Sequence, residues 1–238
     1  MRTATAVAAA IVGLIASSCT FQLRDPGVTS VCTPLVYEIN THQAGIGTEQ
    51  YEAIKEAFND FGGLVGRDVV FNGTTTNTYL THQAGDPVLV ELTWPDDAPD
   101  HLGFASAEIA DNKYVSGWIY FNPAIGQAPP GMVKRLVLHE IGHLYGLLDI
   151  DDPNEIMNPA LTVDTFGPGD LAGLAITHNM GCSDNTLIDT LITQPQTGTL
   201  AAAPTGQHNA AELSELIAPD IDWQTLLNNH TTAHNHTP

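Results

Sequence analysis

Apolar residues recur along the chain at two spacings, which predict a mixture of helices and strands. Residues 48–61 place apolar side chains three or four positions apart, the period of an amphipathic helix, and Gly62-Gly63 are expected to end it. Prolines open two more predicted helices, over residues 131–145 and from about residue 168 to 178. Short apolar runs predict strands over residues 34–40, 68–71, 87–94, 102–109 and 115–121.

This arrangement predicts one α/β (α+β) domain with a twisted mixed sheet, covering residues 32–184. A chain of 238 residues is long enough for one domain with a sizeable core and extensions. Residues 19–31 are interpreted as a short linker. Residues 185–238 are rich in Thr, Asn, Ala, Gln, His and Pro and offer little to bury, so we expect a disordered tail.

The charge balance excludes some partners. The chain has 27 acidic and 7 basic residues, which gives a net charge of −20 with neutral histidines. Such a protein would be repelled by a phosphate backbone and by an anionic membrane surface. Nucleic acid is therefore not an expected partner. For the oligomeric state, we expect a monomer.

Residues 1–18 have the pattern of an export signal. Arg2 supplies a positive charge, residues 4–15 are apolar, and residues 16–18 are small. Spanning a bilayer takes roughly 20 apolar residues, and this run is shorter. Residues 14–19 resemble a bacterial lipobox, in which Cys19 becomes the lipidated first residue; ordinary signal-peptidase cleavage is the alternative. We therefore expect an extracellular or cell-surface protein that touches the bacterial membrane only through such an anchor.

The three cysteines agree with export. Lipidation of Cys19 would leave Cys32 and Cys182 as a pair in an oxidising compartment. A disulfide between them would tie the start of the domain to its end. Closing so long a loop contributes roughly 4–5 kcal/mol in the chain-entropy model. Two unpaired thiols are the alternative.

The segment HEIGH, residues 139–143, is the clearest chemical motif. Residues four apart share one face of a helix, so His139 and His143 are spaced to hold one metal ion through their ring nitrogens. Glu140 lies one residue further round the helix. In that place it can take a proton from a water that the metal activates, rather than bind the metal itself.

A third ligand is expected just after this helix. Gly146 stands where the helix must end and turn, because glycine tolerates left-handed backbone angles. Such a turn would bring Asp149 back toward the two histidines, and carboxylate oxygen is an accepted zinc ligand. Asp151, in the same acidic loop, is the alternative ligand.

Residues 139–149 resemble the extended HExxHxxGxxH/D signature of the metzincin zinc endopeptidases. The segment EIMNP, residues 155–159, is similar to the methionine-containing turn of the matrixin branch, and Asp as third ligand resembles snapalysin. The resemblance covers about residues 32–182. It implies a metzincin-like fold with a small C-terminal subdomain and Met157 as a hydrophobic floor beneath the metal. It also implies that residues 102–108 form the edge strand above the cleft.

Together these features predict an exported zinc-dependent endopeptidase acting on proteins or peptides. His139, His143 and Asp149 would hold one catalytic zinc ion, with Glu140 as general base; calcium is not indicated either way. Two rival functions stay open. One is a surface lipoprotein that binds a partner and keeps a structural or degenerate metal site. The other is a metal-dependent hydrolase acting on bonds other than peptides.

The remaining histidines have no partner at ligand spacing. We interpret His42, His82, His101 and His178 as ordinary polar residues. The histidines of the tail are expected to be solvated.

Overall fold

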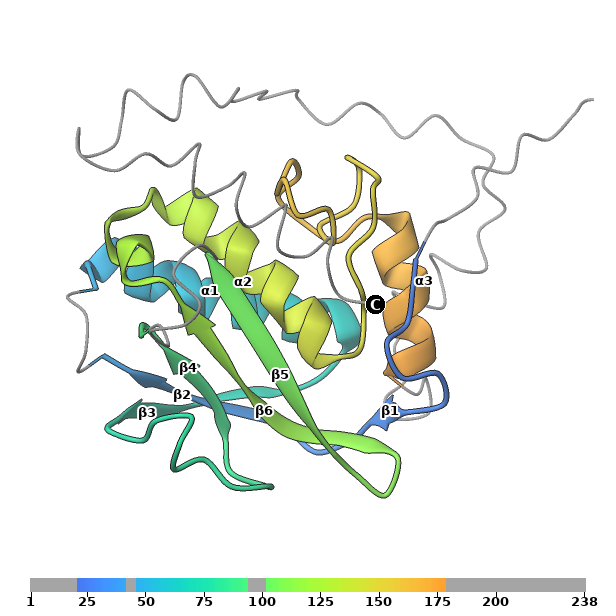
Figure 1. Ribbon diagram of the computed structural model, residues 1–238, viewed down its shortest axis with the longest axis horizontal. Coiled ribbons are helices and arrows are strands. Elements are labelled where there is room, and N and C mark those ends of the chain that lie inside the picture. Colours follow the sequence, from blue (N-terminus) through green and yellow to red (C-terminus); the bar gives the residue numbers. More distant parts are fainter. Residues whose placement is uncertain (1–20, 42–45, 94–101, 179–238) are drawn as a thin grey trace, which may run out of the picture.

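The computed structural model describes residues 21–41, 46–93 and 102–178, which form a mixed sheet, two helices against it and a third at its end (Figure 1). The strands are β1 (Thr29–Ser30), β2 (Leu35–Asn40), β3 (Val69–Thr75), β4 (Val88–Glu91), β5 (Gly103–Ala110) and β6 (Lys113–Phe121). The helices are α1 (Thr48–Val65), the short 3-10 helix η1 (Pro123–Gln127), α2 (Pro130–Leu144) and α3 (Pro168–Thr177). The predicted α/β class and mixed sheet are confirmed.

The sheet has the order β1-β6-β4-β2-β3, and β5 pairs with the other edge of β6. β5 runs antiparallel to β6, from Gly103 opposite Phe121 to Ala110 opposite Lys113, whereas the other pairs are parallel. Within the described ranges no strand covers the second side of β5. β5 is therefore an edge strand, as the resemblance implied for residues 102–108, with backbone groups free to bind an added strand.

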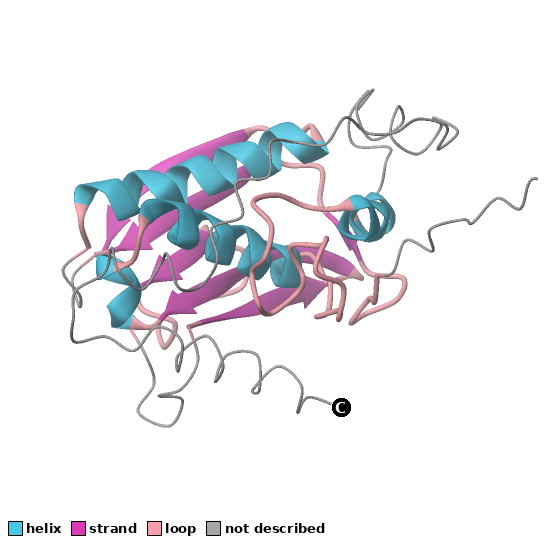
Figure 2. Cartoon of the chain, turned by 90° about the horizontal axis from the view of Figure 1, so that it is seen from above, coloured by secondary structure: helices cyan, strands magenta, loops and turns pink. Residues whose placement is uncertain are grey.

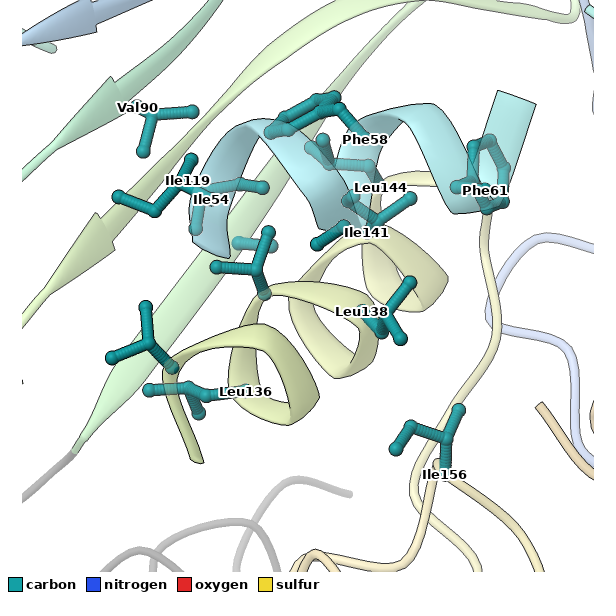
Figure 3. Packing of buried hydrophobic residues seen from close by; sticks show 14 of the residues in the cluster. Ile54, Phe58, Phe61, Val90, Ile119, Leu136, Leu138, Ile141, Leu144 and Ile156 are labelled. Atoms are coloured by element: carbon teal, nitrogen blue, oxygen red, sulfur yellow. The ribbon is translucent and has the colours of Figure 1, made fainter. Parts of the chain in front are cut away.

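Helices α1 and α2 lie side by side on one face of the sheet, whereas α3 lies apart from them (Figure 2). Between α1 and α2, Phe58 and Phe61 gather with Ile141 and Leu144 in one almost fully buried apolar cluster (Figure 3). Burying one large apolar side chain contributes about 1.5–3 kcal/mol. This packing holds α2, which carries the HEIGH motif, in a fixed place above the sheet.

Helix α1 continues past the residues expected to end it. Gly62 and Gly63 lie inside the helix, which ends at Val65, and Gly66 takes the left-handed conformation with φ 63°. A side chain on Gly62 would overlap Val69 of β3. The prediction was wrong because Gly62 allows close helix–strand packing, while Gly66 provides the terminating turn.

Strand β3 is longer than predicted, and β4 is shorter. Beyond Phe71 the apolar pattern of β3 stops, but its ladder with β2 continues, with Ile39 opposite Thr74. Edge strands pair through their backbone whatever their side chains, so periodicity underestimates them. β4 ends at Glu91, short of the predicted residue 94.

Several predictions concern residues outside the described ranges. These are the export signal with Cys19, the positions of His42 and His101, Cys182, and the tail. The disulfide between Cys32 and Cys182 therefore stays a prediction. Within the described part of the chain, no helix combines the length and apolarity needed to cross a bilayer.

Candidate metal centre

Helix α2 places His139 and His143 side by side, as their spacing predicted. The helix begins at Pro130 and runs unbroken to Leu144. The Nε2 atoms of the two rings are 3.2 Å apart, and His139 is completely buried. Two imidazole nitrogens thus meet at one point beside the helix.

The chain turns sharply after α2 because of Gly146. Its φ of 81° is in the left-handed region, and a side chain on it would overlap the Tyr114 hydroxyl. The backbone N–H of Leu147 donates to the carbonyl of Gly142 at 3.0 Å, which closes the end of the helix. Glycine at this position is required both by backbone angle and by space.

This turn brings Asp149 to the two histidines. Its Oδ1 lies 3.2 Å from Nε2 of His139 and 3.4 Å from Nε2 of His143. Asp151, the alternative ligand, is exposed and does not belong to this cluster. His139, His143 and Asp149 are the group of side chains in the described residues that is arranged to hold a metal ion.

Backbone carbonyls set the tautomers of both rings. Nδ1 of His139 donates to the carbonyl of Ile156 at 2.8 Å, and Nδ1 of His143 donates to that of Leu147 at 2.8 Å. A carbonyl only accepts, so each neutral ring keeps its proton on Nδ1. The lone pair of each Nε2 therefore points into the cluster, as a metal ligand requires.

The spacing of the three donor atoms fits zinc. Zinc bonds of about 2.0–2.2 Å at tetrahedral angles put neighbouring donors about 3.3–3.5 Å apart. The three distances here are 3.2, 3.2 and 3.4 Å. Calcium, by contrast, prefers six to eight oxygen ligands. Three protein donors also leave the fourth tetrahedral position free, as in catalytic zinc sites.

The charges around His143 favour a cation in the site. Burial lowers the pKa of His143, but the Asp149 carboxylate, the Glu140 charge and the Leu147 carbonyl together raise it above its ordinary value. A proton and a metal ion compete for the same Nε2 lone pair. The same negative surroundings that hold a proton therefore attract zinc.

Glu140 has the environment of a reactive base. It is fully buried, and neither carboxylate oxygen has a hydrogen-bond partner among the described residues. Gly103, the first residue of edge strand β5, lies against it: a Cβ there would be 2.5 Å from Oε1. A buried carboxylate without a partner is costly, which argues for a role beyond packing.

The segment 155–157 lies behind the ligands. Met157 is buried, and its Sδ packs so closely on Gly142 of α2 that a side chain there would overlap it. The carbonyl of Met157 accepts from the N–H of Ile150, the residue after Asp149, at 3.0 Å. Together with the Ile156 carbonyl on His139, this segment contacts both the helix and the loop that carry the ligands.

Sequence reasoning missed two kinds of supporting group. The carbonyls of Leu147 and Ile156 gave no signal, because every residue has a carbonyl. Two buried carboxyl groups, Glu155 at the start of the 155–157 segment and Asp170 of α3, were also missed. Asp170 is the third residue of α3, and its carboxylate accepts the N–H of Gly167, the residue before the helix, at 3.1 Å. An acidic residue at this position is a capping signal that the sequence pattern could have shown.

His82 is more than an ordinary surface residue, although it lies outside the metal cluster. Its buried ring faces Glu108 Oε1 at 3.3 Å through Nδ1, and the Pro87 carbonyl at 3.0 Å through Nε2. Ser116 Oγ is 3.5 Å from Nε2 but donates to the Asp86 carbonyl. Because Nε2 faces a carbonyl, it is a donor and cannot act as base for Ser116.

His178 is also buried and lies away from the cluster. Its Nδ1 is 2.8 Å from Ser30 Oγ. Burial and the Arg67 charge lower the pKa of His178 to about 4, so the ring is neutral. Both histidines are polar residues without a place among the ligands, as expected, but their burial was not foreseen.

Comparison with known proteins gives only distant structural likeness. No protein-family model matches the chain, and no curated protein matches it. Archaemetzincin from Methanopyrus kandleri is 13% identical with TM-score 0.37, over 68% of this chain and 97% of its own. Metalloproteinase-II from Bacteroides fragilis is 14% identical with TM-score 0.38, over 68% of this chain and 59% of its own. At such scores, the assignment of function depends on the site's own geometry.

Proposed function

We propose that the protein is a zinc-dependent endopeptidase, with zinc held by His139, His143 and Asp149. The observation that carries the proposal is the convergence of three donor atoms at tetrahedral zinc spacing, 3.2 to 3.4 Å apart. The fixed tautomers of both histidines and the negative surroundings support it. The sequence resemblance to the metzincins, including the Met157 turn, agrees with this arrangement.

Glu140 is proposed as the general base. When bound, zinc supplies a Lewis acid that polarises the scissile carbonyl and acidifies the attacking water. The Glu140 carboxylate has no hydrogen-bond partner among the described residues, so it is free to take the water proton and later deliver it to the leaving amine. A purely structural zinc site closes all four positions with protein ligands and needs no such base, which disfavours the binding-protein alternative.

Edge strand β5 is proposed to bind the substrate. An extended peptide can add to its free side by main-chain hydrogen bonds, which tolerate many sequences. Gly103, at the start of β5, touches Glu140, so a peptide on this edge would pass beside the base. This proximity favours peptide bonds over other hydrolysable bonds.

We also propose that the chain carries an export signal, a lipid anchor at Cys19 and a disulfide between Cys32 and Cys182. They support action on protein or peptide substrates outside the cytoplasm, by a monomer secreted or anchored at the cell surface. Alkylation of both thiols in the native, unreduced protein would contradict the disulfide.

Cleavage of a mixed peptide library, read by mass spectrometry, tests the function. We expect cleavage by the zinc-loaded protein, loss after chelation, and recovery on adding zinc back. Glu140→Ala should abolish cleavage, while Glu52→Gln, at an exposed partner of Lys55, should leave it unchanged. Absence of cleavage with zinc bound at one equivalent would favour the binding lipoprotein.

A further inference from the structure

Two buried carboxyl groups meet behind the metal centre. Glu155 is 3% exposed and Asp170 is 0% exposed. Glu155 accepts the N–H groups of Gly169 at 2.8 Å and Asp170 at 2.9 Å, at the start of α3. Asp170 Oδ2 accepts those of Ile156 at 2.6 Å and Gly167 at 3.1 Å. Asp170 Oδ1 is buried and has no donor among the described residues.

The pair holds the segment that supports the ligands. The N–H of Ile156 binds Asp170, and the carbonyl of Ile156 receives the Nδ1 proton of His139. The carbonyl of Met157 holds Ile150, next to Asp149. A shift of the 155–157 segment would therefore disturb two of the three metal ligands.

One negative charge suits this place, and two do not. The N-terminal end of α3 carries a partial positive charge that stabilises one carboxylate. The pKa of Asp170 is raised to about 7, mainly by burial and further by the Glu155 charge and a hydrogen bond between the two carboxyl groups. The backbone N–H groups of Gly167 and Ile156 lower this pKa, but by less. Asp170 thus keeps its proton in mildly acidic solution.

We propose that Glu155 and Asp170 share one proton and act as positioning residues for the metal centre. The proton sits on Asp170 Oδ1, the oxygen that lacks a backbone donor, and bonds to the Glu155 carboxylate. Loss of this proton puts two negative charges side by side and loosens the 155–157 segment. The inference rests on the proposed metal centre and adds a pH-dependent control of it.

The sign of the pH effect follows from the raised pKa. Between the ordinary carboxyl pKa of 3.8 and about 7, the unfolded chain has lost this proton while the folded protein keeps it. The stability that the proton contributes is therefore lost progressively over this window. Above about pH 7 the folded pair is doubly charged, and the support of His139 weakens.

The structure offers a matched set of variants. In Asp170→Asn, the amide oxygen can keep the bonds to Ile156 and Gly167 while the amide NH₂ donates to Glu155, a permanent copy of the protonated state. In Glu155→Gln, one of two accepting oxygens becomes a donor that faces a backbone N–H, which disrupts the pair. Asp164→Asn, at a 90% exposed side chain, is the control.

The infrared spectrum reports the proton directly. The carbonyl band of the protonated Asp170 carboxyl should appear in the difference between native spectra at pH 6 and pH 8.5, because the proton is lost as the pH rises through about 7. It should be missing from the same difference spectrum of Asp170→Asn. Persistence of this band in Asp170→Asn, or its absence in the native protein at pH 6, would overturn the shared proton. This measurement needs neither zinc nor substrate.

Zinc affinity tests the positioning role. The native protein and Asp170→Asn should bind zinc equally at pH 6. At pH 8.5 the native protein should bind zinc about tenfold more weakly than Asp170→Asn, since groups that support metal ligands commonly change metal affinity 10–100-fold. Asp164→Asn should follow the native protein. A native-to-Asp170→Asn affinity ratio that stays constant over this range would overturn the positioning role. No zinc binding by any variant would contradict the metal centre itself.

Discussion

Oδ1 of Asp149 lies 3.2 Å from Nε2 of His139, although the end of α2 and a left-handed turn separate the two residues. This distance matches two neighbouring ligands of one tetrahedral zinc ion. Asp149 is therefore positioned to serve as a ligand together with His139.

Removing Asp149 should remove most of the metal affinity. We expect Asp149→Ala to bind zinc at least about 100-fold more weakly. Losing a side chain that binds the metal directly should cost more than losing a group that only supports a ligand, which costs about 10–100-fold. Zinc titration against a competing chelator measures this. Asp151→Ala, at an exposed position, should bind within about twofold of the native protein. Equal losses in the two variants would contradict the assignment.

Two glycine substitutions should change stability in opposite directions. Gly146→Ala should lower the free energy of unfolding by about 1–3 kcal/mol or more, because of its φ of 81° and the overlap with Tyr114. Gly63→Ala should raise it by about 0.5–1 kcal/mol, since Gly63 is inside helix α1 with open space around it. Urea unfolding measures both. A stabilising Gly146→Ala would show that the turn differs from the one described.

The fold and the ligand cluster were readable from the sequence to different depths. The helix period and the His139–His143 spacing predicted α2 and its two ligands because both depend on local geometry. The turn at Gly146 could be predicted since few residues adopt its backbone angles. The partners of the ring Nδ1 atoms could not, because Ile156 is brought to His139 only by tertiary packing. The end of α1 was misjudged for the same reason. Gly62 is needed because Val69 packs against it, and this contact forms only in the folded protein.

Zinc affinity should fall as the pH is lowered. The raised pKa of His143 means that the metal-free fold keeps a proton on this ring at a higher pH than usual, and zinc must displace it. The proton stabilises the metal-free fold fully below the ordinary pKa of 6.5, and this contribution is lost as pH rises through the folded value. Calorimetric titration in Asp170→Asn, at several pH values, isolates this effect and should show proton release on zinc binding.

A matched control exists for that titration. His178→Gln removes a histidine that is already neutral, with its pKa lowered to about 4. When His178→Gln is added to Asp170→Asn, zinc affinity should change with pH just as it does in Asp170→Asn alone. An affinity that does not change between pH 8 and pH 6 would contradict protonation at the ligand cluster.

Gly103→Ala should separate catalysis from metal binding. The added methyl group would lie 2.5 Å from Glu140 Oε1 and force the carboxylate to move. We expect zinc affinity within about twofold of native and cleavage about 10–100-fold slower, since small displacements of catalytic groups have effects of this size. Gly131→Ala, with open space around it at the start of α2, is the control. Equal activity of both variants would show that Glu140 is not held by β5.

The most direct test of the central claim compares native protein and Glu140→Gln at equal zinc content, on the best peptide from the library. The amide keeps the shape of the side chain but cannot take a proton. We predict one zinc ion per chain in both proteins and a value of kcat/KM at least about 100-fold lower in Glu140→Gln. Cleavage by Glu140→Gln at the native rate would contradict the account, because the peptidase activity would then not depend on this base.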